Sequence, residues 1–296
     1  MSRPRSLELP PGARSARLDT ARGDLAALVA TPLAKPDDRL PALLVPGFTG
    51  SKEDFIAVLE PLAASGRRVV AIDQRGQFES IGSDDPSTYA LEELGRDVLA
   101  VAAALGGRVH VVGHSFGGYV VRTAAALDGG SARIASLTLM DSGPGRVTGA
   151  QTLADLALLT AALPEHDMET IWRTKRELER ELGAPDPTPD VEVFLHDRFV
   201  RTHPTALTVA AGQLLAAADR LVDLHARTVP LLVITGDAED VWNADELVAM
   251  ADRLGAPCAI ISDSGHSPAV DQPSATAARL VEFWDDVESE DTAGSP

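Results

Sequence analysis

Residues 109–119 read VHVVGHSFGGY, an apolar run that leads into a serine flanked by glycines and then into a segment of helical character. The pattern G-x-S-x-G between a strand and a helix is typical of a sharp nucleophile turn. Serine in such a turn takes strained, positive-φ backbone angles, which requires that Gly113 and Gly117 carry no bulky side chain. The pattern predicts that the hydroxyl of Ser115 stands exposed above the edge of a sheet.

Phe116 opens the helix that follows this serine. The first backbone N–H groups of a helix have no acceptor inside the helix, and the helix dipole makes that end positive. We therefore expect the N–H of Phe116 to donate a hydrogen bond to negative charge that develops near Ser115.

On both sides of this turn, short leucine-rich or β-branched runs alternate with longer Ala/Leu segments of helical period. Strand-like runs lie at 41–46, 68–73, 109–113, 136–140, 230–235 and 258–262, and two more at 16–19 and 25–31 predict a hairpin. The runs are nearly continuously apolar, which is typical of parallel strands that are covered on both faces. The sequence predicts an α/β fold with a mostly parallel central sheet of about eight strands flanked by helices.

The alternation is interrupted once, between residues 143 and 224, where only amphipathic helical patterns occur. We predict an α/β core built from residues 1–142 and 225–287, a helical insertion at 143–224, and a flexible tail at 288–296.

The composition excludes several classes of function. The 296 residues carry 44 Asp and Glu against 26 Lys and Arg, a net charge of −18, and this field repels nucleic acid and anionic lipid surfaces. The longest apolar run, at 98–105, is far shorter than the ~18 residues that span a bilayer, and no secretory signal is visible. Cys258 alone can form neither an internal disulfide nor a thiolate metal cage. We expect a cytoplasmic protein with a small-molecule substrate and no metal, cofactor, nucleic acid or membrane partner, and we make no prediction of oligomeric state.

These features resemble the α/β-hydrolase superfamily over about residues 25–284, and in particular its capped serine hydrolases of esterase or lipase type. The resemblance implies an oxyanion-hole loop after the third strand, where this chain has PGFTG at 46–50. The donor there is the N–H of the residue after Gly47, which is Phe48. Relatives usually have histidine where this chain has Pro46. The absence of that histidine removes no oxyanion-hole donor, because the donor is a backbone N–H.

A second loop, DQRGQFES at 73–80, matches a D-x-R-G-x-G-x-S pattern of relatives, with Phe78 in place of the second glycine. We interpret Asp73 and Arg75 as a pair that fixes this loop, because arginine cannot shuttle protons near neutral pH. Phe78 is expected to narrow the entrance to the site.

A serine hydroxyl needs a base, and the family order of serine, acid and histidine selects His266 in the segment SGHSP at 264–268. The acid is ambiguous within TGDAEDVW at 235–242. Relatives commonly place it three residues after the glycine, at Glu239, whereas Asp is the commoner acid and a one-residue loop adjustment would present Asp240, which we slightly favour. Asp141 is a third candidate, because some relatives place the acid after the sixth strand.

The resemblance implies that the insertion is a cap that covers the site and sets substrate choice. Cap residues that could line the pocket, although helix packing is the commoner role of such residues, are Leu153, Leu156, Leu159, Ile171, Trp172, Phe194 and Phe199. The expected reaction is hydrolysis of an ester-type bond in a small, largely apolar substrate through an acyl-serine intermediate. The alternatives are non-hydrolytic use of the same residues, as in a lyase, a cofactor-free perhydrolase or a cyclisation enzyme, and a non-catalytic binding protein. Epoxide hydrolases and haloalkane dehalogenases of this fold use aspartate where this chain has Ser115.

Overall fold

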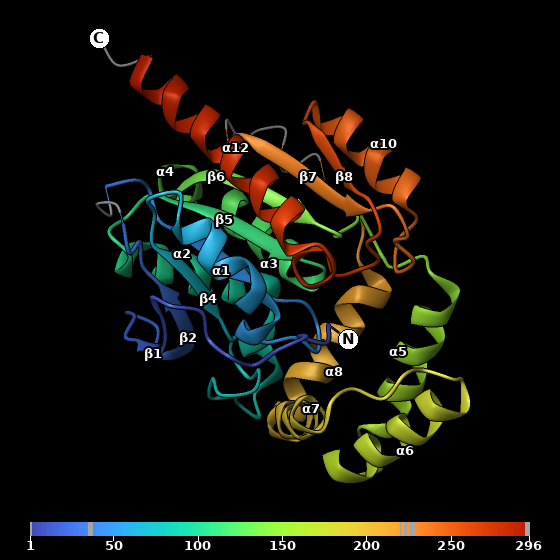
Figure 1. The fold of residues 1–296 in the computed structure, drawn as a ribbon. Helices are drawn as coiled ribbons and strands as arrows, with labels where there is room; N and C mark the ends of the chain where they lie inside the picture. Colours follow the sequence, from blue (N-terminus) through green and yellow to red (C-terminus); the bar gives the residue numbers. More distant parts are fainter. Residues whose placement is uncertain (1, 35–37, 220, 222–223, 225–228, 294–296) are drawn as a thin grey trace.

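The computed structural model describes residues 2–34, 38–219, 221, 224 and 229–293 and has an eight-stranded sheet at its centre (Figure 1). The strand order is β1-β2-β4-β3-β5-β6-β7-β8; β1 pairs antiparallel with β2 and β2 antiparallel with β4, whereas the other neighbours are parallel. The strands are β1 Ala13–Leu18, β2 Leu25–Ala30, β3 Ala42–Val45, β4 Val69–Ile72, β5 Val109–His114, β6 Ile134–Met140, β7 Leu231–Gly236 and β8 Cys258–Ile261. The predicted mostly parallel sheet of about eight strands, including its hairpin, is confirmed.

Helices cover both faces of this sheet because its strands alternate side chains between two apolar cores. Leu43 and Val45 of β3 belong to one core, and Ala42 and Leu44 to the other. The first core is completed by α2 (Leu91–Ala104), α3 (Phe116–Ala126) and α10 (Ala244–Leu254), and the second by α1 (Ile56–Ala63) and α12 (Pro273–Ala293). The shorter helices of the core are α4 (Gly130–Arg133), α11 (Pro268–Asp271) and two 3₁₀ turns, η1 (Lys52–Phe55) and η2 (Pro86–Tyr89).

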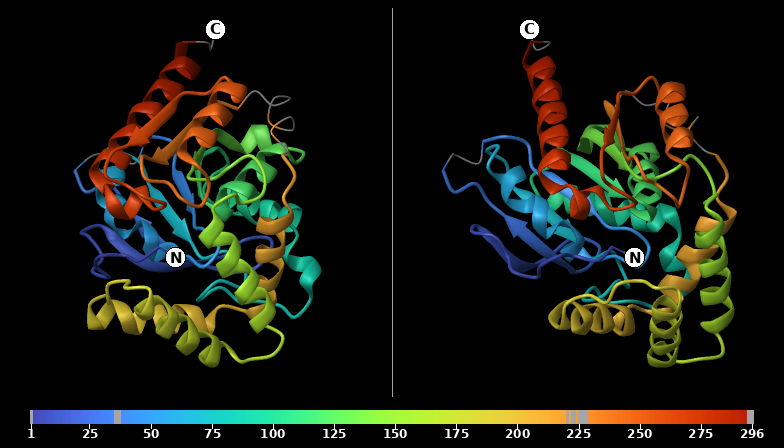
Figure 2. Two further views of the ribbon diagram at one scale, coloured as in Figure 1. Left: turned by 90° about the vertical axis from the view of Figure 1, so that its right-hand side faces the viewer. Right: turned by 45° about the vertical axis from the view of Figure 1, so that its right-hand side comes forward.

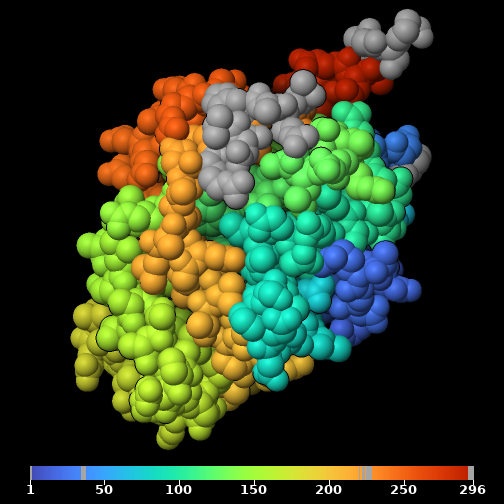
Figure 3. Space-filling view, turned by 180° about the vertical axis from the view of Figure 1, so that it is seen from behind, coloured from blue at the N-terminus to red at the C-terminus, as the bar shows by residue number. Residues whose placement is uncertain are grey.

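Four helices of the insertion form a layer across one end of the core (Figure 2): α5 (Ala150–Ala162), α6 (Met168–Glu181), α7 (Pro189–Arg201) and α8 (Pro204–Ala216). We call residues 143–216 the cap. The helices α6 and α7 share an apolar cluster of their own, which includes Trp172 and Phe199. In contrast, α8 joins the main core and contacts η2, so that the cap is continuous with the core along α8 (Figure 3). The predicted boundary between residues 224 and 225 adjoins a segment outside the described residues.

One buried ion pair fastens the cap to the core. Arg198 of α7 is fully buried and donates to the carboxylate of Asp54 in η1 at 2.7 Å and to the carbonyl oxygen of Ser2 at 2.7 Å. The side chain of Ser2 is in turn hydrogen-bonded to that of Ser267, the neighbour of His266, at 2.9 Å. The cap, the first residues of the described chain and the loop after β8 are therefore linked by polar contacts.

The predicted flexible tail at 288–296 needs correction, because α12 continues to Ala293 and residues 294–296 lie outside the described part. The cause is a long-range charge contact. The buried guanidinium of Arg67 donates to Asp285 and Glu288 at 2.9 Å each, and Glu288 also contacts His110 at 3.0 Å. Sequence polarity suggested a solvated tail from residue 288, but Glu288 is a partner of the buried cation Arg67. None of the described helices is long and apolar enough to cross a bilayer.

Candidate active site

Ser115 lies on the tight turn between β5 and α3, with φ of +53°. Its backbone N–H donates to the carbonyl oxygen of Met140 at 2.9 Å, which fixes the turn to the next strand. A side chain at Gly113 would lie 2.5 Å from the carbonyl oxygen of Gly117, and one at Gly117 would meet the backbone of Val45. Both glycines are therefore required by close packing, as the sequence predicted.

The imidazole of His266 joins this serine to a carboxylate. Its Nε2 lies 2.9 Å from Oγ of Ser115, and its Nδ1 lies 2.8 Å from Oε2 of Glu239. A carboxylate only accepts hydrogen bonds, so Nδ1 carries the hydrogen and Nε2 accepts from the serine hydroxyl. This arrangement can withdraw the serine proton and stabilise the imidazolium that results.

Glu239, and not Asp240, is the acid that contacts the imidazole. Its side chain is fully buried, and Oε1 accepts the backbone N–H groups of Val241 and Trp242 at 2.9 and 3.0 Å. Asp240 is exposed and makes no contact with His266 among the described residues. Our slight preference for Asp240 is corrected: these two N–H donors hold the chain so that the family spacing applies without a loop adjustment.

Asp141, the third candidate, is also present at the site. It follows β6 with φ of +42°, is fully buried, and accepts the N–H of Gly236 at 3.1 Å. Its carboxylate and one ring nitrogen each of His114 and His266 lie within 4.8 Å of one another. Burial and the negative charge of Glu239 raise the pKa of Asp141 well above its ordinary value.

The loop at 46–50 meets the serine as predicted. A Cβ atom at Gly47 would lie 3.0 Å from Cβ of Ser115, so the loop backbone lies directly beside this serine. Within the described chain, neither the N–H of Phe48 nor that of Phe116 donates to a protein acceptor. Two unpaired N–H groups beside one hydroxyl can stabilise an oxyanion.

Two glutamines that the sequence analysis did not identify hold this loop. The side-chain amide of Gln74 donates to the carbonyl oxygen of Pro46 at 2.9 Å, and that of Gln77 donates to the carbonyl oxygen of Gly47 at 2.8 Å. Both glutamines belong to the segment DQRGQ, in which only the aspartate and arginine had been considered. The sequence signal that could have identified these glutamines is their side-chain amides, which can donate hydrogen bonds to backbone carbonyl groups of a neighbouring loop.

The predicted pairing of Asp73 with Arg75 is also corrected, because each binds a different partner. Asp73 accepts from the buried ammonium of Lys52 at 2.9 Å, and Arg75 donates to Asp97 at 2.7 and 2.9 Å. Phe78, with φ of +37°, packs edge-on against Phe194 of the cap at 5.7 Å between ring centroids. The loop is thus fixed by residues from η1 and α2, and Phe78 lies where the core meets the cap.

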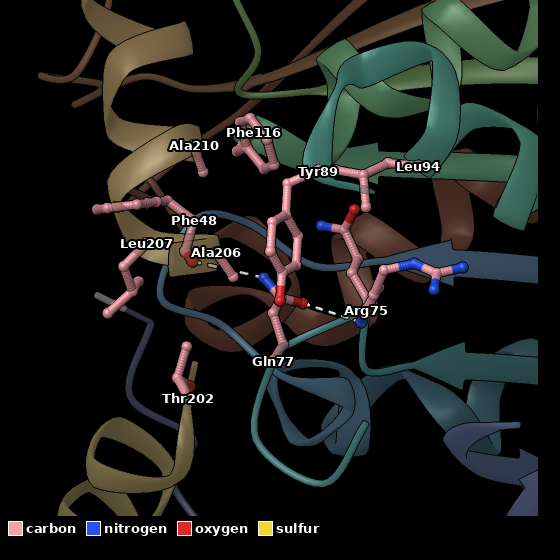
Figure 4. Close-up of a pocket in the computed structure, with 11 residues that line it drawn as sticks. Phe48, Arg75, Gln77, Tyr89, Leu94, Phe116, Thr202, Ala206, Leu207 and Ala210 are labelled. Atoms are coloured by element: carbon pink, nitrogen blue, oxygen red, sulfur yellow. Dashed lines mark hydrogen bonds between the residues drawn. The ribbon is translucent and has the colours of Figure 1, made fainter. Parts of the chain in front are cut away.

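A small cavity of about 20 Å³ lies beside the loop and under the cap (Figure 4). This volume is sufficient for about one water molecule. Phe48 and Phe116 line it from the core, and Thr202, Ala206, Leu207 and Ala210 line it from the cap. None of the cap residues that the sequence suggested as pocket-lining borders this cavity. Three of them, Ile171, Trp172 and Phe199, belong instead to the separate cluster between α6 and α7. Oε1 of Gln74, which also borders the cavity, has no hydrogen-bond partner within the described chain.

The group of His114, Asp141 and His266 is the one set of three potential metal ligands found among the described residues. Its histidine nitrogens are already engaged, since Nε2 of His114 donates to the carbonyl oxygen of His266 at 2.6 Å and both ring nitrogens of His266 have partners. Burial and the charge of His266 lower the pKa of His114 to about 3, so His114 is neutral. Through the hydrogen bond from His114, this group holds the loop that carries His266.

Comparison with known proteins identifies the family. The chain matches the model of the alpha/beta hydrolase family over residues 42–279, and it belongs to that family. RutD of Variovorax paradoxus, provisionally named a carbamate hydrolase, is 38% identical over 137 residues, which are 45% of this chain and 50% of the relative. Epoxide hydrolase B of Mycobacterium tuberculosis is 38% identical over 94 residues, 31% of this chain and 26% of that protein. The matched part spans half or less of these relatives.

Solved structures share the fold over nearly the whole chain. A thermophilic esterase from Thermogutta terrifontis has a TM-score of 0.70 at 23% identity and covers 93% of this chain and 99% of its own. The enol-lactonase from Burkholderia xenovorans has a TM-score of 0.70 at 20% identity and covers 90% and 99%. At these identities the likeness establishes the fold alone. The family and its members support a hydrolase.

Proposed function

We propose that this hydrolase cleaves an ester-type bond of a small, largely apolar substrate through an acyl-serine intermediate. The observation that carries the proposal is the continuous hydrogen-bonded chain from Ser115 through His266 to Glu239, with lengths of 2.9 and 2.8 Å. Nucleophile, base and orienting acid in this order are the requirements of acyl transfer.

In the first half-reaction, His266 takes the proton of Ser115 while the oxygen attacks the substrate carbonyl. The unpaired N–H groups of Phe48 and Phe116 then donate to the oxyanion, and the glutamines at 74 and 77 keep the first of these donors in place. His266 next gives its proton to the leaving group, which leaves the acyl group on Ser115. Water releases the acyl group by the same steps, with His266 again as base.

The residue at the nucleophile position favours ester-type cleavage over epoxide opening, although one relative is named as an epoxide hydrolase. The tight turn after β5 carries Ser115 rather than an aspartate. The intact chain of three residues also favours an enzyme over a binding protein.

Labelling by a fluorophosphonate probe tests the nucleophile directly. We expect one equivalent of probe on Ser115 in the wild-type protein and none in Ser115→Ala, and peptide mass spectrometry would locate the adduct. Thr160→Ala serves as the control, because it removes another hydroxyl, a partly buried one that donates to the carbonyl oxygen of Leu156 within α5, without touching the site. Absence of labelling in a folded wild-type protein would overturn the proposal.

A panel of p-nitrophenyl esters of increasing acyl length then tests the substrate class. Phe48 and Phe116 border a cavity of only about 20 Å³, so we expect kcat/KM to fall as the acyl chain lengthens. Release of p-nitrophenol by wild type but not by Ser115→Ala would support hydrolysis, whereas labelling without any ester turnover would favour non-hydrolytic chemistry at the same residues.

A further inference from the structure

Asp141 is held rigidly beside the Ser115–His266–Glu239 chain, but it does not form part of it. Its backbone N–H donates to the carbonyl oxygen of Ile234 at 2.9 Å, and its Oδ1 accepts the N–H of Gly236 at 3.1 Å, so β7 fixes both ends of the residue. A non-glycine residue at φ of +42° is strained, and such strain is retained where the surrounding structure requires it.

The second oxygen of this carboxyl group lacks a donor. Oδ2 of Asp141 is buried and has no hydrogen-bond partner within the described part of the chain. The side chain of Glu239, which is also fully buried, lies within hydrogen-bond reach of Asp141. Two buried carboxylates at this separation cannot both be ionised, because like charges repel strongly where water does not screen them.

The other contacts decide which of the two groups keeps its charge. Glu239 accepts hydrogen bonds from the imidazole and from the N–H groups of Val241 and Trp242. Asp141 accepts the N–H of Gly236 and a hydrogen bond from the side chain of Thr235, two neutral donors without the imidazole that Glu239 has, so hydrogen bonding stabilises the anion of Glu239 more than that of Asp141. One proton placed on Oδ2 of Asp141 would therefore remove both the repulsion and the unpaired oxygen.

We propose that Asp141 is a neutral carboxylic acid at neutral pH, donates its proton to the carboxylate of Glu239, and serves as a positioning residue that can replace Glu239 as acceptor for His266. The groups that face it are His114, His266 and Glu239. The direction of its pKa, raised by burial and by Glu239, agrees with a neutral side chain. The catalytic consequence rests on the proposed function, whereas the protonation state does not.

Infrared difference spectroscopy tests the protonation state without any substrate. At pH 8, the spectrum of wild type minus Asp141→Asn should contain the C=O stretching band of one protonated carboxylic acid, and this band should shift in deuterium oxide. Asp240→Asn is the matched control, since it changes an exposed aspartate next to Glu239 and should give no such band. Absence of the band in the Asp141 difference spectrum would overturn the proposal even if the enzyme is an active esterase.

A double-mutant cycle tests the replacement role. Asp141→Asn keeps a neutral donor toward Glu239 and should lower kcat/KM by less than about tenfold, whereas Asp141→Leu, which has no donor, should lower it further. In Glu239→Gln, Asp141 loses its charged neighbour, ionises and accepts from His266. We therefore expect Asp141→Asn to cost at least about tenfold more in the Glu239→Gln background than in the wild type, a coupling that independent residues do not show.

The outcomes separate the two proposals. Equal effects of Asp141→Asn in both backgrounds would overturn the replacement role, and the fluorophosphonate reaction of Ser115 measured in the same variants would still report on the serine mechanism. If instead no variant and no wild-type sample reacts with the probe, the proposed function fails, and the infrared band alone decides whether Asp141 is protonated. Thermal unfolding of each variant identifies any that is simply misfolded.

Discussion

The core side and the cap side of the site are packed differently. Beside Ser115, glycines 113 and 117 leave no room for a methyl group. In the cap, α6 and α7 pack on each other through an apolar cluster that contains no residue of a core strand. The core end of the site is fixed by hydrogen bonds from three strands and their loops. The cap is joined to the core by α8 and by the buried pair of Arg198 and Asp54. In the proposed reaction, charge develops on the closely packed core side of the site and the substrate enters on the cap side, which we expect to open separately from the core.

The largest effect in this comparison should come from the core. His266→Ala removes the base, and we expect kcat to fall by ~10⁴–10⁶-fold while the free energy of unfolding changes by less than about 1 kcal/mol. Steady-state ester hydrolysis and urea denaturation measure the two quantities. A loss of less than about a hundredfold would mean that another group takes the proton of Ser115.

The second effect concerns the attachment of the cap. Arg198→Met leaves the carboxylate of Asp54 buried without its cation, and removal of one partner of a buried pair typically costs ~3–5 kcal/mol. The double variant Arg198→Met/Asp54→Leu should recover most of this loss, because no charge remains buried. Denaturant unfolding gives the stability, and hydrogen exchange over residues 168–201 should report opening of the cap before the core. If the amides of β5 lost as much protection from hydrogen exchange as residues 168–201, the cap would not open separately from the core.

The third prediction is a pH effect confined to the core. Because the pKa of His114 in the folded protein is about 3, the unfolded chain binds a proton there below its ordinary value of 6.5 and the folded chain does not. His114 therefore costs no stability above pH 6.5 and destabilises the protein progressively as the pH falls toward 3, by about 1.4 kcal/mol per pH unit.

A matched pair of variants isolates this contribution from that of the buried carboxyl groups. His114→Gln keeps a donor for the carbonyl oxygen of His266 but cannot titrate, so its unfolding free energy should fall less steeply between pH 6 and 4 than that of wild type. His166→Gln changes an exposed histidine of the cap and should follow wild type. Parallel curves for wild type and His114→Gln would refute the assignment.

The smallest effect should come from the outer surface of the cap. Arg180 pairs with Asp186 at 3.1 Å, but their side chains are 52% and 64% exposed. Exposed pairs contribute ~0–1 kcal/mol because water and salt screen them. Arg180→Ala should therefore change the midpoint of urea unfolding only slightly and leave kcat unchanged; a loss above about 2 kcal/mol would show that this surface also holds the cap.

Local patterns were enough to predict the turn at Ser115, the parallel strands and the hairpin, because apolar runs and obligatory glycines act over a few residues. The same reasoning failed for α12 beyond residue 287. There, Glu288 was expected to begin a solvated tail, and only the position of Arg67, more than 200 residues earlier in the chain, makes it the partner of a buried cation. It also missed Lys52 as the partner of Asp73, since one lysine in a polar segment carries no local signal.

The sequence by itself determined the class of fold, the tight turn at Ser115 and three candidate acids, since these depend on neighbours along the chain. Tertiary structure alone decided which of these carboxylates contacts His266. Glu239 and His266 meet across 27 residues and His266 and Ser115 across 151, and two backbone N–H groups, rather than residue type, aim the carboxylate. It also decided that Asp141 lies beside Glu239, because β6 and β7 end at the same edge of the sheet and bring their following residues together.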